Sequence, residues 1–362
     1  MQTEFDLEQY LNNGVENILK NIMKAVIKNP KQSAFFAKYL FSVNKLKKRR
    51  ADAKCAGQHI PAFLIASITK KCNLHCRGCY ARENHSCGEN LGEDTLTSNE
   101  WSHIFDQAKN LGIGFILLAG GEPLLRKDII EEAAKYPEIL FPIFTNGTMI
   151  NESYIKTLQK YRNIIPLLSL EGTAHITDER RGDGVYKKLM HVMDEMNQKG
   201  ILYGVSLTVT KRNIKDVSEY AFVDTLHKKG CKGIIYVEYV PVDTSTRELT
   251  PNEEEREYLS EQLYELRKKW DDMVFLSFPG DEKASGGCLA AGRGFFHINA
   301  KGGAEPCPFS PFSDVNVVET SLMEALHSPL FMKLGEENVI DMDHIGGCVL
   351  FEQEEKVKEL LL

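Results

Sequence analysis

The sequence contains no run of the about 18 to 20 apolar residues that a helix needs to span a bilayer. It also lacks an excess of positive charge, since 44 lysines and arginines stand against 51 aspartates and glutamates, a net charge of -7. This balance argues against nucleic acid as the main partner. The nine cysteines are an odd number and no secretory signal is evident, so a disulfide framework is not expected. We therefore expect a cytoplasmic protein whose thiols stay reduced.

Short apolar segments typical of strands alternate with amphipathic segments, at intervals of roughly 25 to 35 residues. This alternation is typical of βα units around a parallel sheet and predicts an α/β fold. A capping box at Thr97 to Glu100 predicts a helix over 101–111, and Asn151 opens another that continues through Tyr161. The expected strands are 63–69, 115–119, 140–145, 164–170, 201–210 and 234–240.

Three cysteines follow the first expected strand in a C-x3-C-x2-C spacing: Cys72, Cys76 and Cys79. An iron–sulfur cube normally takes four thiolates. A compact loop that offers three therefore indicates a cluster with one iron left open to bind something else. A structural zinc site is the alternative, because a fourth soft ligand is available close by in the sequence. The candidates for it are His75, His85 and Cys87.

A second motif follows the strand expected over 115–119, where Gly120, Gly121, Glu122 and Pro123 form a turn. Glycines let the backbone approach a ligand closely, and Glu122 offers a charge-assisted acceptor to an ammonium. With both motifs present in this order, the chain resembles the radical S-adenosylmethionine (SAM) enzymes. In that family the three thiolates hold a [4Fe-4S] cluster whose free iron chelates SAM, and the Gly-Gly-Glu-Pro strand end binds the SAM amino group.

The resemblance implies a fold, a reaction and partners. The fold is a partial (β/α)6 barrel of the TIM type, whose sites gather at the carboxyl ends of the strands. The reaction is a one-electron cleavage of SAM that releases a 5′-deoxyadenosyl radical for hydrogen abstraction. A flavodoxin- or ferredoxin-type protein would supply the electron. Many members carry an aromatic residue just before the third cysteine; this chain has Gly78 there, and Tyr80 just after it is the aromatic candidate for cofactor contact.

Polar residues at the ends of later strands are further candidates for binding SAM. Asn146 follows the third strand. Ser169 and Glu171 end the fourth, in a segment similar to the one that contacts the SAM ribose in related enzymes. Ser206 lies in the fifth strand, where apolar and hydroxyl residues alternate. The hydroxyl residues of the fifth strand are explained equally well as part of the ordinary composition of a strand.

Three charged residues are candidates for contact with substrate. Glu238 and Asp243 lie in the segment that ends the sixth strand, although an acid at that position equally fits a structural role. Arg181 lies in the run 178–184, where two glycines among charged residues predict a solvated loop. If that loop is functional, Arg181 offers a guanidinium fork to a carboxylate or phosphate of the substrate.

The tail contains a second set of three cysteines, Cys288, Cys307 and Cys348, the first two in a C-x13-G-x4-C arrangement. The segment 295–303 between them reads as a β-hairpin, which brings flanking cysteines together. This pattern resembles the auxiliary-cluster extension of radical SAM enzymes named SPASM, or Twitch in its one-cluster form. The resemblance implies one auxiliary [4Fe-4S] cluster, because the full SPASM pattern has seven cysteines for two clusters. The fourth ligand is not evident, and a zinc ribbon is the alternative.

The first 55 residues show apolar residues at helical spacing with a break at Pro30, and then a basic cluster from Lys45 to Arg50. We expect a helical hairpin packed on the barrel. Contact with an anionic membrane surface, or with a partner protein, is the alternative. The radical SAM core is then expected over 56–250, and a linker helix with the auxiliary-cluster domain over 251–362.

The sequence as a whole predicts a radical SAM oxidoreductase whose auxiliary cluster handles electrons from the substrate. A peptide side chain, a small molecule and a lipid are the candidate substrates. The alternative from another class of protein is a non-catalytic zinc or iron–sulfur scaffold.

Overall fold

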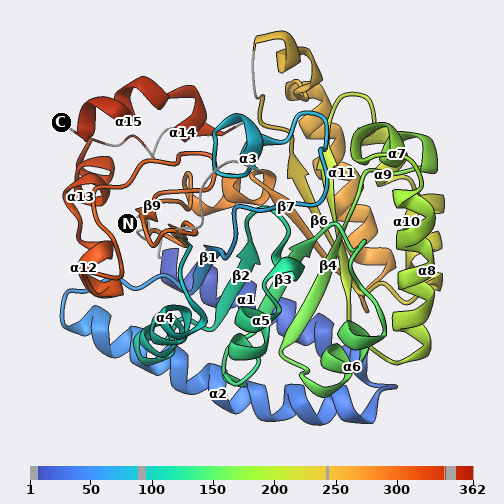
Figure 1. Ribbon diagram of the computed structural model, residues 1–362, viewed down its shortest axis with the longest axis horizontal. Coiled ribbons are helices and arrows are strands. Elements are labelled where there is room, and N and C mark those ends of the chain that lie inside the picture. The colour runs from blue at the N-terminus through green and yellow to red at the C-terminus, as the bar shows by residue number, and fades with distance from the viewer. Residues whose placement is uncertain (1–6, 89–94, 242–243, 338, 340–347, 362) are drawn as a thin grey trace, which may run out of the picture.

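A computed structural model describes residues 7–88, 95–241, 244–337, 339 and 348–361 of the chain. Within these ranges nine strands form one sheet in the order β7-β6-β5-β4-β3-β2-β1-β8-β9. Neighbouring strands are parallel except β8 and β9. The sheet curls into a half-barrel with helices on its outer side (Figure 1). The predicted partial α/β barrel is confirmed.

The strands are β1 Phe63–Ser67, β2 Phe115–Ala119, β3 Phe141–Thr145, β4 Ile164–Leu170, β5 Gly204–Val209, β6 Gly233–Glu238, β7 Val274–Phe278, β8 His297–Ile298 and β9 Ala304–Glu305. The helices through the barrel are α1 Leu7–Val26, α2 Pro30–Cys55, α3 Tyr80–Glu83, α4 Ser98–Leu111, α5 Lys127–Ala133, α6 Glu152–Lys160, α7 Ala174–Arg181, α8 Val185–Gln198, α9 Ile214–Ser218, α10 Tyr220–Lys228 and α11 Glu253–Lys269. The tail adds α12 Leu322–Leu326, α13 Pro329–Glu336, α14 Val349–Glu352 and α15 Glu354–Leu360, and three short 3₁₀ turns are η1 Pro123–Leu125, η2 Thr244–Leu249 and η3 Gly280–Ser285.

The six predicted strands are all present, and β7 beside β6 was not predicted. A five-residue apolar run is too short to distinguish a strand from a buried helical segment by its pattern. The loop predicted over 178–184 is wrong in its first half, because α7 continues through Arg181. The helix ends at Gly182, whose φ of 108° is a value that glycine adopts without steric cost.

The two predicted helix starts are confirmed. The amide of Thr97 donates to Glu100 Oε2 at 2.7 Å, and the amide of Glu100 donates to Thr97 Oγ1 at 3.3 Å, so the capping box of α4 is complete. The amide of Tyr154 donates to Asn151 Oδ1 at 3.1 Å at the start of α6. These bonds satisfy amides that have no partner inside a helix.

Helices α1 and α2 form the expected hairpin and cross the amino-terminal end of the barrel (Figure 1). Tyr39 is buried there and its Oη donates to the carbonyl of Gly114 at 2.9 Å. Arg50, the last residue of the basic cluster, is also buried and donates to Asn12 Oδ1 at 2.9 Å. This end of the cluster therefore packs against the protein. None of the helices described is long and apolar enough to cross a membrane.

The tail joins the barrel through β8, which pairs in parallel with β1. The β8 and β9 strands form the predicted hairpin, and Gly302 in its turn has a φ of 90°. Because β1 leads directly into the first cysteine loop, this pairing brings the tail to the same end of the sheet. Figure 1 shows α3 and α14 near each other at that end.

Candidate active site

Cys72, Cys76 and Cys79 lie on the loop between β1 and α3, and all three residues are partly exposed. Gly78 has a φ of 63°, and a Cβ there would lie 2.8 Å from Oη of Tyr239. The loop therefore requires glycine before its third cysteine, because the ring of Tyr239 occupies the space that a side chain would need.

Cys87 reaches the same loop from the segment after α3. It is buried, and its side-chain hydrogen bond with Cys72 is the largest cause that lowers the pKa of Cys72. This shift favours the thiolate, which is the form of cysteine that binds metals. Cys87 therefore contacts a candidate ligand although it belongs to neither cysteine motif.

Arg180 and Arg181, at the end of α7, brace the cysteine loop. Arg180 donates from Nε to the carbonyl of Arg77 at 3.1 Å and from Nη2 to the carbonyl of Gly78 at 3.4 Å. Both guanidinium groups pair with Glu171, which is only 1% exposed. Arg180 Nη1 lies 3.0 Å from Oε2 of Glu171, and Arg181 Nε lies 2.8 Å from Oε1. Glu171 therefore positions the loop through two arginines.

Arg181 also faces the cysteine loop itself, because its Nη1 lies 3.9 Å from Sγ of Cys76. Burial raises the pKa of Cys76, and the positive charge of Arg181 opposes that shift. The guanidinium is placed to stabilise a thiolate at Cys76. Arg181 is paired with Glu171, and only 11% of its side chain is exposed. The sequence had instead predicted a solvated loop here.

Gly120 and Gly121 follow β2 where the backbone that leads into the cysteine loop passes close by. A Cβ on Gly120 would lie 2.3 Å from the carbonyl oxygen of Thr69, and one on Gly121 would lie 2.2 Å from that of Lys71. The amides of Gly121 and Glu122 donate to these two carbonyls, at 2.9 and 2.8 Å. Both glycines are thus required by the close approach of two backbone segments.

The carboxylate of Glu122 is 1% exposed and accepts three hydrogen bonds. Oε1 accepts from the amide of Leu124 at 3.0 Å and from Oγ1 of Thr145 at 2.6 Å, and Oε2 accepts from the amide of Asn146 at 2.8 Å. Burial raises the pKa of Glu122 to about 7, and these bonds oppose the shift. The side chain therefore ties the end of β2 to the end of β3, and both of its oxygens are engaged.

Asn146 connects the end of β3 with the cysteine loop. Its Nδ2 donates to Oδ1 of Asn73 at 2.8 Å, and its Oδ1 accepts from Oγ1 of Thr148 at 2.7 Å. Nδ2 of Asn73 donates to the same Oγ1 at 2.9 Å. Asn73 was not predicted, and the only signal for it in the sequence is its position directly after the first cysteine.

Ser169 and Ser206 are register partners on β4 and β5, and their Oγ atoms lie 3.5 Å apart. The two hydroxyls therefore share one face of the sheet. Glu238 at the end of β6 is paired with Arg256 of α11, whose Nε lies 3.0 Å from each carboxylate oxygen. Asp243 lies outside the residues that the structure describes.

Two tyrosines lie near the cysteine loop. The ring of Tyr80 packs on Phe309 of the tail, with centroids 4.6 Å apart, so Tyr80 links the loop to the tail. Tyr239, which follows β6, instead places its ring beside Gly78. Its Oη is buried and has no hydrogen-bond partner in the described part of the chain. The sequence motif gives no signal for Tyr239, because the contact joins two distant segments.

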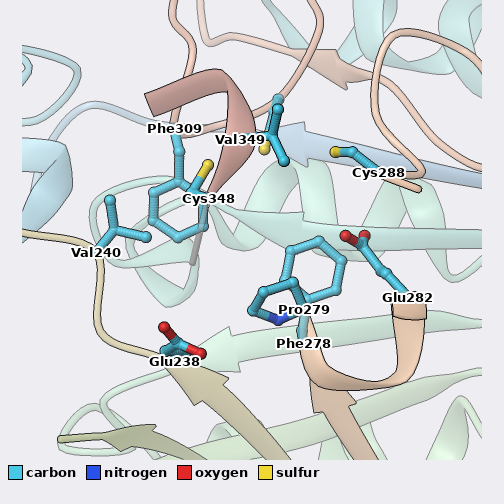
Figure 2. A pocket seen from close by; sticks show the side chains of 10 residues that line it. Glu238, Val240, Phe278, Pro279, Glu282, Cys288, Phe309, Cys348 and Val349 are labelled. Atoms are coloured by element: carbon cyan, nitrogen blue, oxygen red, sulfur yellow. The ribbon is translucent and has the colours of Figure 1, made fainter. Parts of the chain in front are cut away.

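Cys288, Cys307 and Cys348 line one cavity between the tail and the ends of β6 and β7 (Figure 2). The cavity contains about 320 Å³ of empty space, including its open mouth. Burial is the largest cause that raises the pKa of each thiol, that of Cys348 to about 12. A bound metal cation reverses this effect by favouring the thiolates. The donor set therefore fits an iron–sulfur cluster, and the cavity also contains the carboxylates of Glu238 and Glu282.

A chain of hydrogen bonds joins β1 to the tail hairpin. Nε2 of His297 lies 2.8 Å from Oγ of Ser67, and its Nδ1 lies 2.7 Å from Oε2 of Glu305. His297 and Glu305 are both buried. Sequence reasoning missed this group because Ser67 and His297 are 230 positions apart.

Among the residues that the structure describes, no three His, Cys, Asp or Glu side chains converge closely enough to hold one metal ion. In an iron–sulfur cube each iron takes its own protein ligand, so the ligands stand farther apart than those of a single zinc ion. The arrangement of the cysteines is compatible with such clusters.

The family model described as "Radical SAM superfamily" matches residues 66–237, which include both the cysteine loop and the turn after β2. The Fe-coproporphyrin III synthase of Methanosarcina barkeri is 29% identical over 199 residues, 52% of this chain and 48% of that protein. The sporulation killing factor maturation protein SkfB of Bacillus subtilis is 24% identical over 280 residues, 74% of this chain and 65% of that protein. The chain thus spans about half to two thirds of the length of these two relatives.

Among solved structures, SuiB of Streptococcus suis bound to S-adenosylmethionine superposes with a TM-score of 0.67 at 19% sequence identity. The match covers 83% of this chain and 76% of SuiB. At this identity the likeness shows the fold.

Proposed function

We propose that the chain is a radical SAM enzyme that oxidises a peptide side chain with the help of an auxiliary [4Fe-4S] cluster, because the model of the radical SAM superfamily matches residues 66–237. The family implies a [4Fe-4S] cluster and SAM, which when bound supply a 5′-deoxyadenosyl radical that abstracts hydrogen from the substrate. Loss of one hydrogen atom leaves one electron to be removed before a stable oxidised product forms. That electron requires an acceptor.

One observation carries this proposal: two separate sets of three cysteines lie at the carboxyl end of the sheet, the first on the loop after β1 and the second in a cavity lined by the last residues of β6 and β7. Cys72, Cys76 and Cys79 would hold the cluster that binds SAM. The second set, in the cavity of Figure 2, would hold the auxiliary cluster. The contact of Tyr80 with Phe309 joins the two regions directly. A second cluster next to the first would be suitably placed to accept the electron.

The residues around the first loop then have positioning roles. Arg180 and Glu171 hold the loop backbone, and Arg181 stabilises the thiolate of Cys76. The end of β3 supports the loop through Asn146. Ser169 and Ser206 present hydroxyls on the inner strands and are our candidates to contact SAM or substrate.

The substrate class rests on the relatives. SkfB is named as a maturation protein for a sporulation killing factor, and its match covers 74% of this chain. A peptide is therefore our first candidate. The match to Fe-coproporphyrin III synthase, at the higher identity of 29%, supports an iron porphyrin as the second candidate.

All nine cysteines are free of disulfide bonds, which is compatible with the reducing cytoplasm and with a flavodoxin- or ferredoxin-type reductant there. Such a reductant would deliver the electron that starts each turnover.

The test is anaerobic reconstitution with iron and sulfide, followed by dithionite and SAM. We expect 5′-deoxyadenosine, detected by mass spectrometry, from the wild type and from Cys55→Ala, which removes an exposed thiol outside both sets. Cys76→Ala should form none. A wild type loaded with iron that forms no 5′-deoxyadenosine would favour the non-catalytic scaffold.

A second measurement separates the two substrate classes. The enzyme is supplied with either deuterated peptides or a deuterated iron porphyrin, and the deuterium content of 5′-deoxyadenosine is measured. Deuterium from the peptides supports the first candidate. Deuterium from the porphyrin alone would replace it with the second.

A further inference from the structure

Glu282 lies in the cavity that the three tail cysteines line, and none of the roles above accounts for it. It belongs to η3, the short turn after β7, and it is 2% exposed. Figure 2 shows its carboxylate directed into the cavity on the side of Cys288. Its charge also contributes to the raised pKa of all three cysteines, in agreement with their proximity.

One oxygen of Glu282 has no partner. Oε1 is buried and makes no hydrogen bond in the described part of the chain. The other buried glutamates there have both oxygens engaged: Glu122 by three donors, Glu171 by two arginines, and Glu305 by His297 and Asn299. A buried carboxylate costs several kcal/mol unless it is paired or binds a metal. Among these four glutamates, only Glu282 has a carboxylate oxygen without a partner.

The backbone around Glu282 is held in place. Its amide donates to the carbonyl of Pro279 at 2.7 Å, and its carbonyl accepts from Oγ of Ser285 at 2.6 Å. The guanidinium of Arg293 donates to the carbonyl of Cys288 at 2.7 Å. The carboxylate and the first cysteine of the set are thus fixed on neighbouring, well-braced segments, as a ligand pair needs to be.

We propose that Glu282 is the fourth protein ligand of the auxiliary cluster and binds, through its unpartnered oxygen, the iron that Cys288, Cys307 and Cys348 leave open. This inference rests on the auxiliary cluster of the proposed function. Three thiolates and one carboxylate supply one ligand to each iron of a cube. The cluster in turn compensates the buried charge. A carboxylate oxygen is a harder ligand than a thiolate, so the iron bound to Glu282 differs electronically from the other three.

The test uses the full chain with Cys72, Cys76 and Cys79 all replaced by alanine, so that only the auxiliary cluster is loaded. After anaerobic reconstitution with iron and sulfide, the iron content and the Mössbauer spectrum are measured. We expect about four irons per chain, one of them with a distinct signal. Glu282→Cys should keep about four irons and lose the distinct signal, because all four ligands are then sulfur.

Glu282→Gln removes the ligand charge but keeps the size of the side chain. We expect its cluster to lose one iron on mild oxidation and to show the electron paramagnetic resonance signal of a three-iron cluster. Glu305→Gln is the matched control, since it changes another buried glutamate of the tail whose oxygens are bound to protein donors. That variant should keep the parent's iron content and spectrum.

The proposal is overturned if Glu282→Gln keeps four irons and the parent's spectrum through the oxidation. If that variant does not fold, Glu282→Cys decides, because an unchanged spectrum there contradicts ligation by the carboxylate. A parent that takes up no iron shows that there is no auxiliary cluster and also ends the proposal. Formation of 5′-deoxyadenosine by the wild type is measured separately, so the failure of this inference is distinguishable from failure of the radical SAM reaction.

Discussion

Replacing Glu122 by glutamine tests whether this side chain holds the fold together or contacts SAM. Its carboxylate accepts hydrogen bonds from Leu124, Thr145 and Asn146, and no cation pairs with it among the contacts above. Glutamine retains one acceptor oxygen and can keep the two bonds to Oε1. Its amide group then faces the amide of Asn146, where two donors meet.

The expected cost follows from that lost bond. One buried donor left without an acceptor costs about 1 to 3 kcal/mol. Glu122→Ala leaves all three donors unpaired and opens a cavity, so its cost should be larger, roughly 3 kcal/mol or more. Glu131→Gln is the control, because Glu131 is exposed on α5 and its contact with Lys127 is a surface ion pair.

The loss of stability caused by Glu122→Gln should depend on pH. Burial raises the pKa of Glu122 from its ordinary 4.5 to about 7, so the folded protein holds this proton more tightly than the unfolded chain does. The stability from this proton is complete below pH 4.5 and is lost as the pH rises through 7, a loss of about 3 kcal/mol. Glutamine does not titrate. The wild type's advantage over Glu122→Gln should therefore be larger at pH 5 than at pH 8.

The assay is thermal unfolding of the full chain under anaerobic conditions at pH 5 and pH 8, together with SAM affinity. A stability difference that is the same at both pH values would refute the argument about burial. A Glu122→Gln variant with wild-type stability at both pH values and no affinity for SAM would instead show that the carboxylate binds the ammonium of SAM directly.

Three further substitutions follow from the contacts at the site and in the hairpin. Gly121→Ala places a Cβ 2.2 Å from the carbonyl oxygen of Lys71, so the cysteine loop should shift and the iron content should fall. Gly14→Ala is the control and should leave the iron content unchanged, because no atom lies within 4 Å of its Cβ. Glu171→Gln leaves Arg180 and Arg181 without a negative charge and should lower the free energy of unfolding by about 3 kcal/mol. An unchanged melting temperature would contradict a stabilising role for these two ion pairs. Tyr39→Phe removes the hydrogen bond from Oη to the carbonyl of Gly114, which still accepts from the amide of Leu140, and should cost about 1 kcal/mol by the same measurement, without an effect on iron content.

Local patterns in the sequence accounted for much of the fold. Six strands, two helix starts and the tail hairpin were predicted from signals that lie within a few neighbouring residues. The run at 178–184 was misjudged because glycines and charges there indicated a loop. Its arginines instead lie at the end of α7 and pair with Glu171, which follows β4, and no local pattern reveals this contact.

The residues of the candidate site likewise include some that local sequence patterns identify and others that they do not. Cysteine spacing identifies ligands that one short loop brings together, so Cys72 to Cys79 were evident from the sequence. The contacts of Glu122 and Gly78 were not, because each depends on what lies opposite: three hydrogen-bond donors in the first case and the ring of Tyr239 in the second.

The sequence by itself determined that the chain carries two sets of three cysteines and a glycine turn after a buried strand, because those ligands and turns are local features. Only the tertiary structure decided how the sets relate. The parallel pairing of β1 with β8 brings the tail beside the first loop, and burial leaves one oxygen of Glu282 unpartnered among the tail cysteines. The pairing joins segments more than 200 residues apart, and the burial of Glu282 depends on how the tail folds around it, so no spacing rule anticipates either.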